Sequence, residues 1–361
     1  MLVERIKYDK KIGKFWKFPI LGFSIGMLIL TSCGGSKTSE TGEVTESEDP
    51  VAEKISIDIT QARDMSGELT VAGEIIFDES SENFIGIPQQ IAVRGDTIYA
   101  VDPAKSPGLY AYLSDGTQLF SYCSRGDGPE DLSSPFSLNV TDTEISVFDM
   151  MSKSIFFFSK DAKFLRKIPL SIDVCNAMVG GDGSLWVDYT NNQDSDTRLA
   201  WRNNGDSEEK TVLEVPELLK GMTIVEMRSF MPLEDGTINY KPAIEPNIYR
   251  LKDGEAKLKY ELDFVGLWPD EATFRQEYTG NDWPRNIRKF PVLGINVVEN
   301  DRWLIVGFEN NSDRYCYISD KLKSEGVLYK DDKQRYYNPL TVVGDTLYIM
   351  TREDTLAKLK L

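Results

Sequence analysis

Two stretches decide the fold: Val93-Arg-Gly-Asp-Thr-Ile-Tyr-Ala-Val101 and Val342-Val-Gly-Asp-Thr-Leu-Tyr-Ile-Met350. Each contains a short apolar run, a Gly-Asp pair and a second run in which apolar residues alternate with others. A Gly-Asp pair between two such runs is typical of a tight β-hairpin. Because nearly the same hairpin occurs early and late in the chain, the sequence predicts an internal repeat.

Further turn signals lie between these two hairpins. One anchor per hairpin gives positions 96, 142, 182, 235, 301 and 345, at intervals of 46, 40, 53, 66 and 44 residues. A second turn follows each of the first five anchors, so each unit contains four short strands. Four antiparallel strands every 40–50 residues are the signature of a β-propeller blade. We therefore predict an all-β, six-bladed β-propeller over residues 55–361.

The last repeat is incomplete, because its second turn would fall beyond residue 361. A blade that lacks its outer strand leaves unpaired backbone groups at an edge. The segment Glu68–Phe77 precedes the first blade and has strand character. We expect this N-terminal strand to complete the last blade and close the ring.

The strand order also assigns the two faces of the ring. The tight turns share one face, whereas the blade-to-blade connections and the loops between second and third strands share the other, here called the connection face. Its longest segment is an insertion near Gly266–Leu293, which accounts for the 66-residue interval. Long loops on a rigid scaffold are common binding sites.

The insertion carries a helix signal. Pro269 at a first helical position, followed by Asp270 and Glu271, predicts a short helix to about Tyr278, with Gly280 as its stop. Aromatic rings beside guanidinium groups suit sugars, carboxylates or a protein partner. The candidate binding residues in this segment are Trp268, Phe274, Arg275, Tyr278, Trp283, Arg285 and Arg288. The alternative is a lid whose aromatic side chains simply pack on the rim.

The N-terminal segment predicts export. Met1–Lys17 carries six basic residues, and Phe18–Leu30 is apolar apart from Ser24. This run is too short for a membrane-spanning helix but suits a signal peptide. It ends in Leu30-Thr-Ser-Cys33, which resembles the bacterial lipobox, so residues 1–32 are expected to be removed and Cys33 to be lipidated. Residues 33–54 are rich in Ser, Thr, Gly and Glu and predict a flexible acidic tether. An ordinary secretory signal with an incidental cysteine is the alternative.

Composition excludes several functions. The chain has 58 acidic and 41 basic side chains, a net charge of −17, and loss of residues 1–32 brings this to about −21. A nucleic-acid partner is therefore not expected, and contact with a membrane is expected only through the lipid anchor. The histidine count is 0, which excludes Ser-His-Asp and Cys-His catalytic sites and His-ligated metal sites within this chain.

The segment Arg125-Gly-Asp-Gly-Pro-Glu-Asp-Leu132 is a second candidate site, with Arg125, Asp127 and Glu130 as its binding residues. Its first three residues spell an integrin-binding tripeptide, but Gly128-Pro129 after them favours a turn. The carboxylates of Asp127, Glu130 and Asp131 could serve Ca²⁺, yet their spacing does not match a calcium-binding loop. We expect a solvated acidic turn, with no metal site and no cofactor.

The lipobox, the repeated Gly-Asp-Thr-Ile/Leu-Tyr and the segment 126–132 together resemble the TolB-like six-bladed propeller lipoproteins of Bacteroides-type bacteria, which are related to NHL-repeat propellers. Segment 126–132 resembles the family's G-x-G-P-G-E-[FY] connection and departs from it at Glu130, Asp131 and Leu132. The resemblance implies the fold and an envelope location, with no activity. By a separate resemblance, to lipoprotein sorting rules, Gly34 after Cys33 favours the outer membrane over retention in the inner one.

Three functions remain open at this stage. The leading hypothesis is a lipid-anchored, non-catalytic binding module that presents its connection face to an envelope protein or a glycan-derived ligand. The second is a glycan-active lyase or hydrolase with carboxylate and Tyr groups at the channel mouth. The third is a purely structural envelope component, which would show a broad apolar patch and no pocket.

Overall fold

The computed structural model describes residues 51–123, 128–189, 196–222, 225–279 and 282–361. The predicted signal peptide, most of the predicted tether, Cys33, Arg125 and Asp127 lie outside these ranges.

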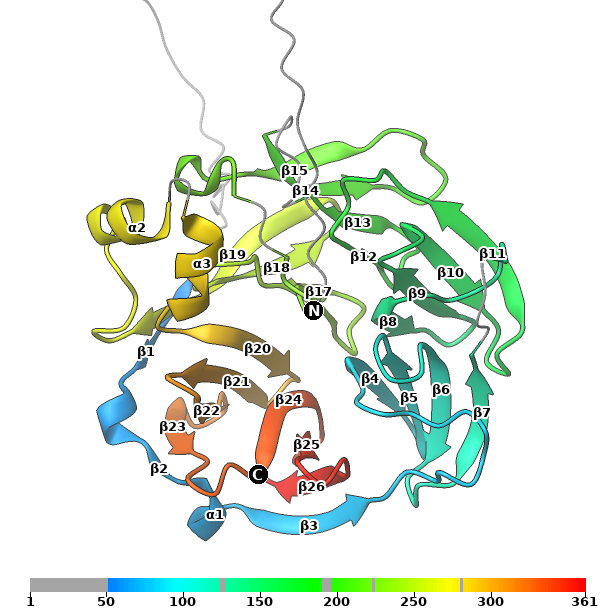
Figure 1. The fold of residues 1–361 in the computed structure, drawn as a ribbon, viewed down its shortest axis with the longest axis horizontal. Helices are drawn as coiled ribbons and strands as arrows, with labels where there is room; N and C mark the ends of the chain where they lie inside the picture. Colours follow the sequence, from blue (N-terminus) through cyan, green and yellow to red (C-terminus); the bar gives the residue numbers. More distant parts are fainter. Residues whose placement is uncertain (1–50, 124–127, 190–195, 223–224, 280–281) are drawn as a thin grey trace, which may run out of the picture. The chain divides into compact units, whose positions relative to one another are not determined.

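Six β-sheets form a ring around a central channel, so the predicted all-β, six-bladed propeller is confirmed (Figure 1). In the first three blades the first strand is innermost, and the strands follow one another outward in chain order. The first blade contains β4 (Gln90–Arg94), β5 (Thr97–Asp102), β6 (Gly108–Leu113) and β7 (Gln118–Tyr122). The second contains β8 (Pro135–Val140), β9 (Ile145–Asp149), β10 (Ser154–Phe158) and β11 (Phe164–Pro169). The third contains β12 (Asn176–Val179), β13 (Leu185–Asp188), β14 (Thr197–Arg202) and β15 (Lys210–Glu214).

The other three blades recruit strands from the N-terminal segment. The fourth contains β16 (Phe230–Pro232), β17 (Ile238–Tyr240), β18 (Asn247–Lys252) and β19 (Glu255–Phe264), with β1 (Glu53–Ile57) as a fifth strand. The fifth contains β20 (Leu293–Glu299), β21 (Trp303–Asn310), β22 (Asp313–Asp320) and β23 (Glu325–Lys330), with β2 (Arg63–Asp64) as its fifth. The sixth contains β24 (Tyr336–Val343), β25 (Thr346–Thr351), β26 (Leu356–Lys360) and β3 (Thr70–Ile75).

The hairpins β4–β5 and β24–β25, from which the repeat was predicted, have the expected geometry. Gly95 and Gly344 have φ angles of 59° and 53°, in the left-handed region that side chains disfavour. Each occupies the first position of a two-residue loop, since Arg94 pairs with Thr97 and Val343 pairs with Thr346. Glycine at this position suits the turns that match the twist of a hairpin.

The N-terminal strand closes the ring as predicted. β3 pairs antiparallel with β26, in a register that aligns Ile75 with Leu356 and Thr70 with Lys360. The outer edge of the last blade is therefore paired, and the two ends of the propeller are joined by backbone hydrogen bonds.

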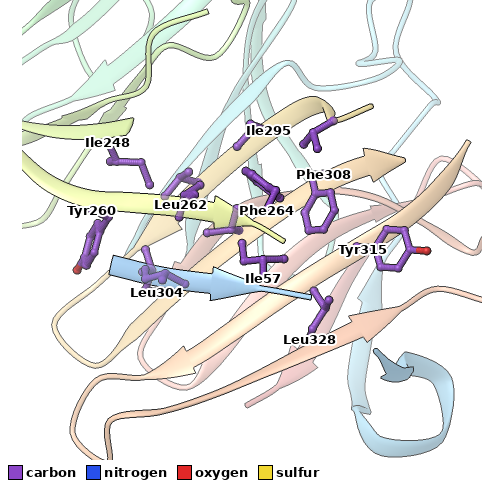
Figure 2. Close-up of a cluster of buried hydrophobic side chains, with 14 of the residues drawn as sticks. Ile57, Ile248, Tyr260, Leu262, Phe264, Ile295, Leu304, Phe308, Tyr315 and Leu328 are labelled. Atoms are coloured by element: carbon purple, nitrogen blue, oxygen red, sulfur yellow. The ribbon is translucent and has the colours of Figure 1, made fainter. Parts of the chain in front are cut away.

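The sequence did not reveal that the N-terminal segment also covers blades four and five. β1 runs parallel to β19 and β2 runs parallel to β23, so these blades have five strands instead of the predicted four. Ile55 and Ile57 are buried with residues of both blades, among them Phe264 and Phe308 (Figure 2). The short helix α1 (Met65–Glu68) buries Met65 between blades five and six. The segment follows the outside of three blades in turn (Figure 1).

The insertion lies between β19 and β20 and contains α2 (Glu271–Tyr278) and α3 (Trp283–Asn286), followed by a 3₁₀ turn at Ile287–Lys289. Another 3₁₀ turn lies at Glu217–Leu219, and one more at Ile59–Gln61. The predicted helix exists but begins later than predicted. Asp270 is its N-cap and accepts a hydrogen bond from the Thr273 amide at 2.7 Å, so Pro269 lies outside the helix. The predicted stop at Gly280 lies outside the described residues.

Candidate functional site

Amide and hydroxyl side chains occupy the interior of the ring. They project from or beside the innermost strands and are buried, and they are Gln90, Ser137, Asn139, Asn176, Ser229 and Asn296. Gln90 accepts a hydrogen bond from the Leu138 amide at 2.9 Å, and Asn176 donates to the Ser229 hydroxyl at 3.0 Å. Gln90 Nε2 also lies 3.4 Å from the Phe230 carbonyl oxygen, which joins blade one to blade four. Neutral polar groups therefore hold the innermost strands together.

A pocket of about 540 Å³ opens at one end of this channel, and we call it the channel-mouth pocket. Its walls come from the segments before β4 and β16, the segment after β17, the insertion, and the first residues of β20 and β24, so it lies on the connection face. It is lined by Gln89, Val225, Glu226, Met227, Arg228, Lys241, Ala243, Ile244, Trp268, Ile287, Arg288, Val292, Leu293, Gly294, Ile295, Asn296 and Asn338. The size falls within the usual range for sites that bind small molecules.

The insertion forms one wall of this pocket because it has an apolar core of its own. Phe274, Tyr278 and Phe290 are buried together, with ring centroids 5.1–5.9 Å apart. Trp268 packs edge-on against Phe290 at 5.0 Å and reaches the pocket. These contacts fix the positions of Ile287 and Arg288 at the pocket wall.

A buried ion pair lies in the part of the wall that blade four supplies. The Lys241 ammonium donates to the Glu226 carboxylate at 2.6 Å, and only 3% of the Lys241 side chain is exposed. Such a short charge-assisted contact neutralises both groups. Glu226 is the one carboxylate among the described residues that line the pocket.

Arg228 is the unusual charge of the site. Its Nη1 is buried and has no hydrogen-bond acceptor among the described residues. Burial lowers the pKa of Arg228 to about 10, and the nearby Glu226 carboxylate only partly offsets this effect. The guanidinium is still protonated at neutral pH, and the one carboxylate among the described lining residues, Glu226, is already held by Lys241.

The backbone of the pocket is also unusual at Ile244. This residue has a φ angle of 53°, in the left-handed region. A β-branched side chain is strongly disfavoured there. Backbone strain of this kind collects at functional sites, where the surrounding structure maintains it.

The predicted binding residues are distributed unevenly over this geometry. Trp268 and Arg288 line the channel-mouth pocket. Phe274 and Tyr278 are buried in the core of the insertion, and Trp283 packs against that core. Arg275 forms an exposed ion pair with Glu271 at 2.7 Å. The remaining described candidates, Arg285 and Glu130, are exposed and do not line the pocket.

Sequence reasoning missed Glu226, Arg228 and Lys241. A signal for Lys241 was present, because a lysine directly follows the apolar strand Ile238–Tyr240. At the same end of the second strand, blades one and two carry Asp102 and Asp149. Glu226 and Arg228 lie in an irregular connection with no motif to single them out.

The chemistry of the pocket favours binding over acid–base catalysis. Its carboxylate is held by Lys241, whereas a general base needs access to a substrate proton. Among the described residues, no group of three or more Asp, Glu or Cys side chains could hold a metal ion. A second cavity of about 530 Å³ follows the β18–β19 hairpin and is lined largely by charged side chains of that hairpin. We place the candidate site at the channel mouth because Arg228 and Asn296 have buried polar atoms there without described partners.

A protein-family model described as "Domain of unknown function (DUF4934)" matches residues 75–360. A crystal structure of a Bacteroides fragilis protein, inferred to be exported, aligns with a TM-score of 0.72 at 15% identity, covering 85% of this chain and 98% of that one. A member of the DUF4221 family from Bacteroides vulgatus aligns with a TM-score of 0.53 at 12% identity, covering 81% of this chain and 97% of that one. A search of curated proteins gave no match.

At these identities the two structures support the propeller fold alone, so the TolB-like assignment stays a prediction. Within the described ranges, no helix combines the length and the apolar character needed to cross a bilayer.

Proposed function

Since the chain belongs to the DUF4934 family, whose description assigns no activity, we propose its function from its site: it is an exported propeller that binds a small ligand non-catalytically in the channel-mouth pocket. The observation that carries the proposal is a 540 Å³ pocket, framed by an insertion with its own core and lined by Arg228, a partly buried and incompletely paired cation. A purely structural component has no need of such a pocket.

We also propose that Cys33 carries a lipid that holds the propeller at the outer membrane. The apolar run before Leu30-Thr-Ser-Cys33 supports this, and so does the likeness to a protein inferred to be exported. The acidic segment after Cys33 then acts as a tether that keeps the propeller away from anionic lipid. The ligand then reaches the connection face from the surrounding solvent.

The anchor is tested by metabolic labelling with a radioactive fatty acid. The full chain is expected to take up the label and to fractionate with outer membranes. Cys33→Ser should lose the label and appear in the soluble fraction, whereas Cys123→Ser should behave as the parent chain. Label that persists in Cys33→Ser would disprove lipidation at this residue.

The binding role is tested by ligand-observed NMR on the full lipidated chain in detergent, with neutral and charged fragments. Met227→Trp adds bulk at the pocket rim, where 53% of Met227 is exposed, so the fold should tolerate it. Met151→Trp is the matched control, because Met151 is an exposed connection-face residue in blade two and does not line the pocket. We expect fragments that bind the parent and Met151→Trp chains but bind Met227→Trp about tenfold more weakly. Absence of any binding fragment, or equal binding by the two variants, would overturn the proposal.

A further inference from the structure

Arg228 is a partly buried cation with a buried Nη1, and the described chain does not complete its hydrogen bonds. A guanidinium carries five N–H donors, and its charge is costly to bury without partners. Nη1 has no acceptor among the described residues, and Nη2 lies 3.5 Å from the Pro88 carbonyl oxygen, at the outer limit of a hydrogen bond. An anion placed at Nη1 would supply the missing partner.

A second arginine beside the same wall shows how this fold treats a structural guanidinium. Only 3% of the Arg198 side chain is exposed, and it forms an ion pair with Glu245. Its Nη2 also donates to the Ala243 carbonyl oxygen at 2.7 Å, although its Nε has no acceptor among the described residues. Arg228 has no equivalent of Glu245, because its nearest acid, Glu226, already receives the Lys241 ammonium at 2.6 Å. The two arginines therefore differ in their acid: Arg198 has Glu245, whereas the described residues supply no free carboxylate for Arg228.

The charge balance of the pocket points to an anionic partner. Arg228, Arg288 and Lys241 line it together with one carboxylate, Glu226. The whole chain, by contrast, has a net charge of −17. A local excess of positive charge in a strongly acidic protein attracts one anionic group to this position.

The rest of the pocket wall indicates the character of the uncharged part of the ligand. Trp268, Ile287, Val292, Leu293 and Ile295 give it an extended apolar surface. One acceptor in this wall, Asn296 Oδ1, is buried and receives no hydrogen bond from a described donor. The pocket therefore combines one cationic end with an apolar interior.

We propose that the ligand is a small molecule with a carboxylate on an apolar body, and that Arg228 binds the carboxylate. This inference rests on the proposed function and names the ligand class for the same pocket. The planar fork of a guanidinium matches the two oxygens of a carboxylate. A phosphate is less well matched, because it commonly requires several cations or a run of backbone N–H groups, and this pocket pairs one of its cations with Glu226.

The test uses the full lipidated chain in detergent and two probes of nearly the same shape, 3-phenylpropionate and 3-phenylpropionamide, with inorganic phosphate as a third. Dissociation constants are measured at one ionic strength by ligand-observed NMR. We expect the carboxylate to bind more tightly than the amide or phosphate. Arg228→Met should weaken carboxylate binding by about 10- to 100-fold and leave amide binding nearly unchanged. Arg285→Met is the control, since Arg285 is exposed and outside the pocket, and should bind as the parent chain does.

Thermal unfolding without any probe distinguishes a stabilising role of Arg228 from a ligand-binding role. Because Arg228 is incompletely paired, Arg228→Met should melt at the same temperature as the parent chain or higher. A fall in melting temperature would assign Arg228 to stability and overturn the inference. Equal affinity for carboxylate and amide, tighter binding of phosphate, or carboxylate binding that survives Arg228→Met would also overturn it, while leaving the pocket as a binding site. If no probe binds and the fragment screen also fails, the proposed function falls as well.

Discussion

Asp149 shows how single residues shape the connection face. It is fully buried at the end of β9, and its carboxylate accepts four backbone N–H groups. Two belong to the β9–β10 loop, at Met151 and Ser152, and two to the connection before β8, at Ser133 and Ser134. Asp102 accepts amides from the equivalent segments of blade one. The carboxylate thus serves as the hydrogen-bond acceptor for loop N–H groups that have no strand partner.

Asp149→Ala is expected to lower the free energy of unfolding by about 2–4 kcal/mol, because it leaves several amides without an acceptor. Chemical denaturation measures the change. Asp142→Ala is the control, since Asp142 is exposed in a turn of the same blade and should change stability by less than about 0.5 kcal/mol. Equal effects of the two substitutions would contradict this role of Asp149.

Glu299 is the centre of a charge cluster between blades four and five. Only 1% of its side chain is exposed, and it lies 2.7 Å from the ammonium groups of Lys259 and Lys321 and 2.9 Å from Arg250. Burial alone would raise the pKa of Glu299, but the lysines and a hydrogen bond from Asn239 outweigh it and lower the pKa to about 2. The carboxylate is therefore more acidic in the folded chain than in the unfolded one.

This shift makes stability depend on pH in a defined direction. The contribution of Glu299 is complete above its unfolded pKa of about 4.5 and is lost as pH falls toward 2. At pH 7 Glu299→Gln should cost about 3 kcal/mol of unfolding free energy. The difference from the parent chain should shrink as the pH falls below about 4.5, measured by urea denaturation. Glu255→Gln, at an exposed position, is the control, and a pH-independent cost of Glu299→Gln would contradict the account.

Among the elements, the N-terminal strands contribute most beyond what the repeat predicts. Ile57 in β1 is 1% exposed and lies between blades four and five (Figure 2). Ile57→Ala should lower the free energy of unfolding by about 2–5 kcal/mol, because it leaves a cavity between the blades. Ser56→Ala, at the exposed neighbouring position, should have little effect. If Ile57→Ala were as stable as Ser56→Ala in thermal unfolding, β1 would not contribute to the core.

The insertion is expected to respond to core substitutions as a separate element. Phe274 is 2% exposed in its core, whereas Arg275 beside it on α2 is exposed. Phe274→Ala should speed hydrogen exchange in α2 and α3 and weaken binding of 3-phenylpropionate, because Trp268 and Arg288 lose their support. Arg275→Ala should leave both unchanged, since an exposed ion pair contributes little. If hydrogen exchange in α2 and α3 stayed slow in Phe274→Ala, contacts with the propeller, and not the insertion's own core, would keep the insertion folded.

How far the sequence predicts each element depends on how local its signal is. The hairpins were predictable because Gly-Asp pairs impose the turn at Gly95 and Gly344. The closing strand followed from a missing partner in the last blade. β1 was not predicted, because Ile55 and Ile57 form too short an alternating run after an acidic segment. The start of α2 was misplaced because Asp270 caps the helix with its side chain, a role that competes with a place in the first turn.

The site was less predictable than the fold for the same physical reason. Trp268 and Arg288 were accessible to prediction because a single insertion brings them together. Arg228, Lys241 and Asn296 belong to different segments of blades four and five, and only the packing of these two blades brings them to one pocket. What distinguishes these residues is how deeply their polar atoms are buried and whether those atoms have hydrogen-bond partners, and neither can be read from a single sequence.

For the whole molecule, closure of the ring and the binding site are linked. Two glutamines at the start of blade one contact the backbone of blade four. Gln89 Nε2 lies near the Met227 carbonyl oxygen, just before β16, and Gln90 Nε2 lies near the Phe230 carbonyl oxygen, at the start of β16. The pocket thus draws walls from blades one, four, five and six, and a rigid ring keeps Arg228 facing it without an acid of its own. An external carboxylate would complete this arrangement.

The most direct test is a crystal structure of the protein grown with 3-phenylpropionate. We expect the carboxylate within about 2.7–3.0 Å of Arg228 Nη1, with the phenyl ring against Trp268 and the apolar wall. A probe bound only in the cavity along β18–β19, or an Arg228 that remains unpaired beside a bound probe, would contradict it.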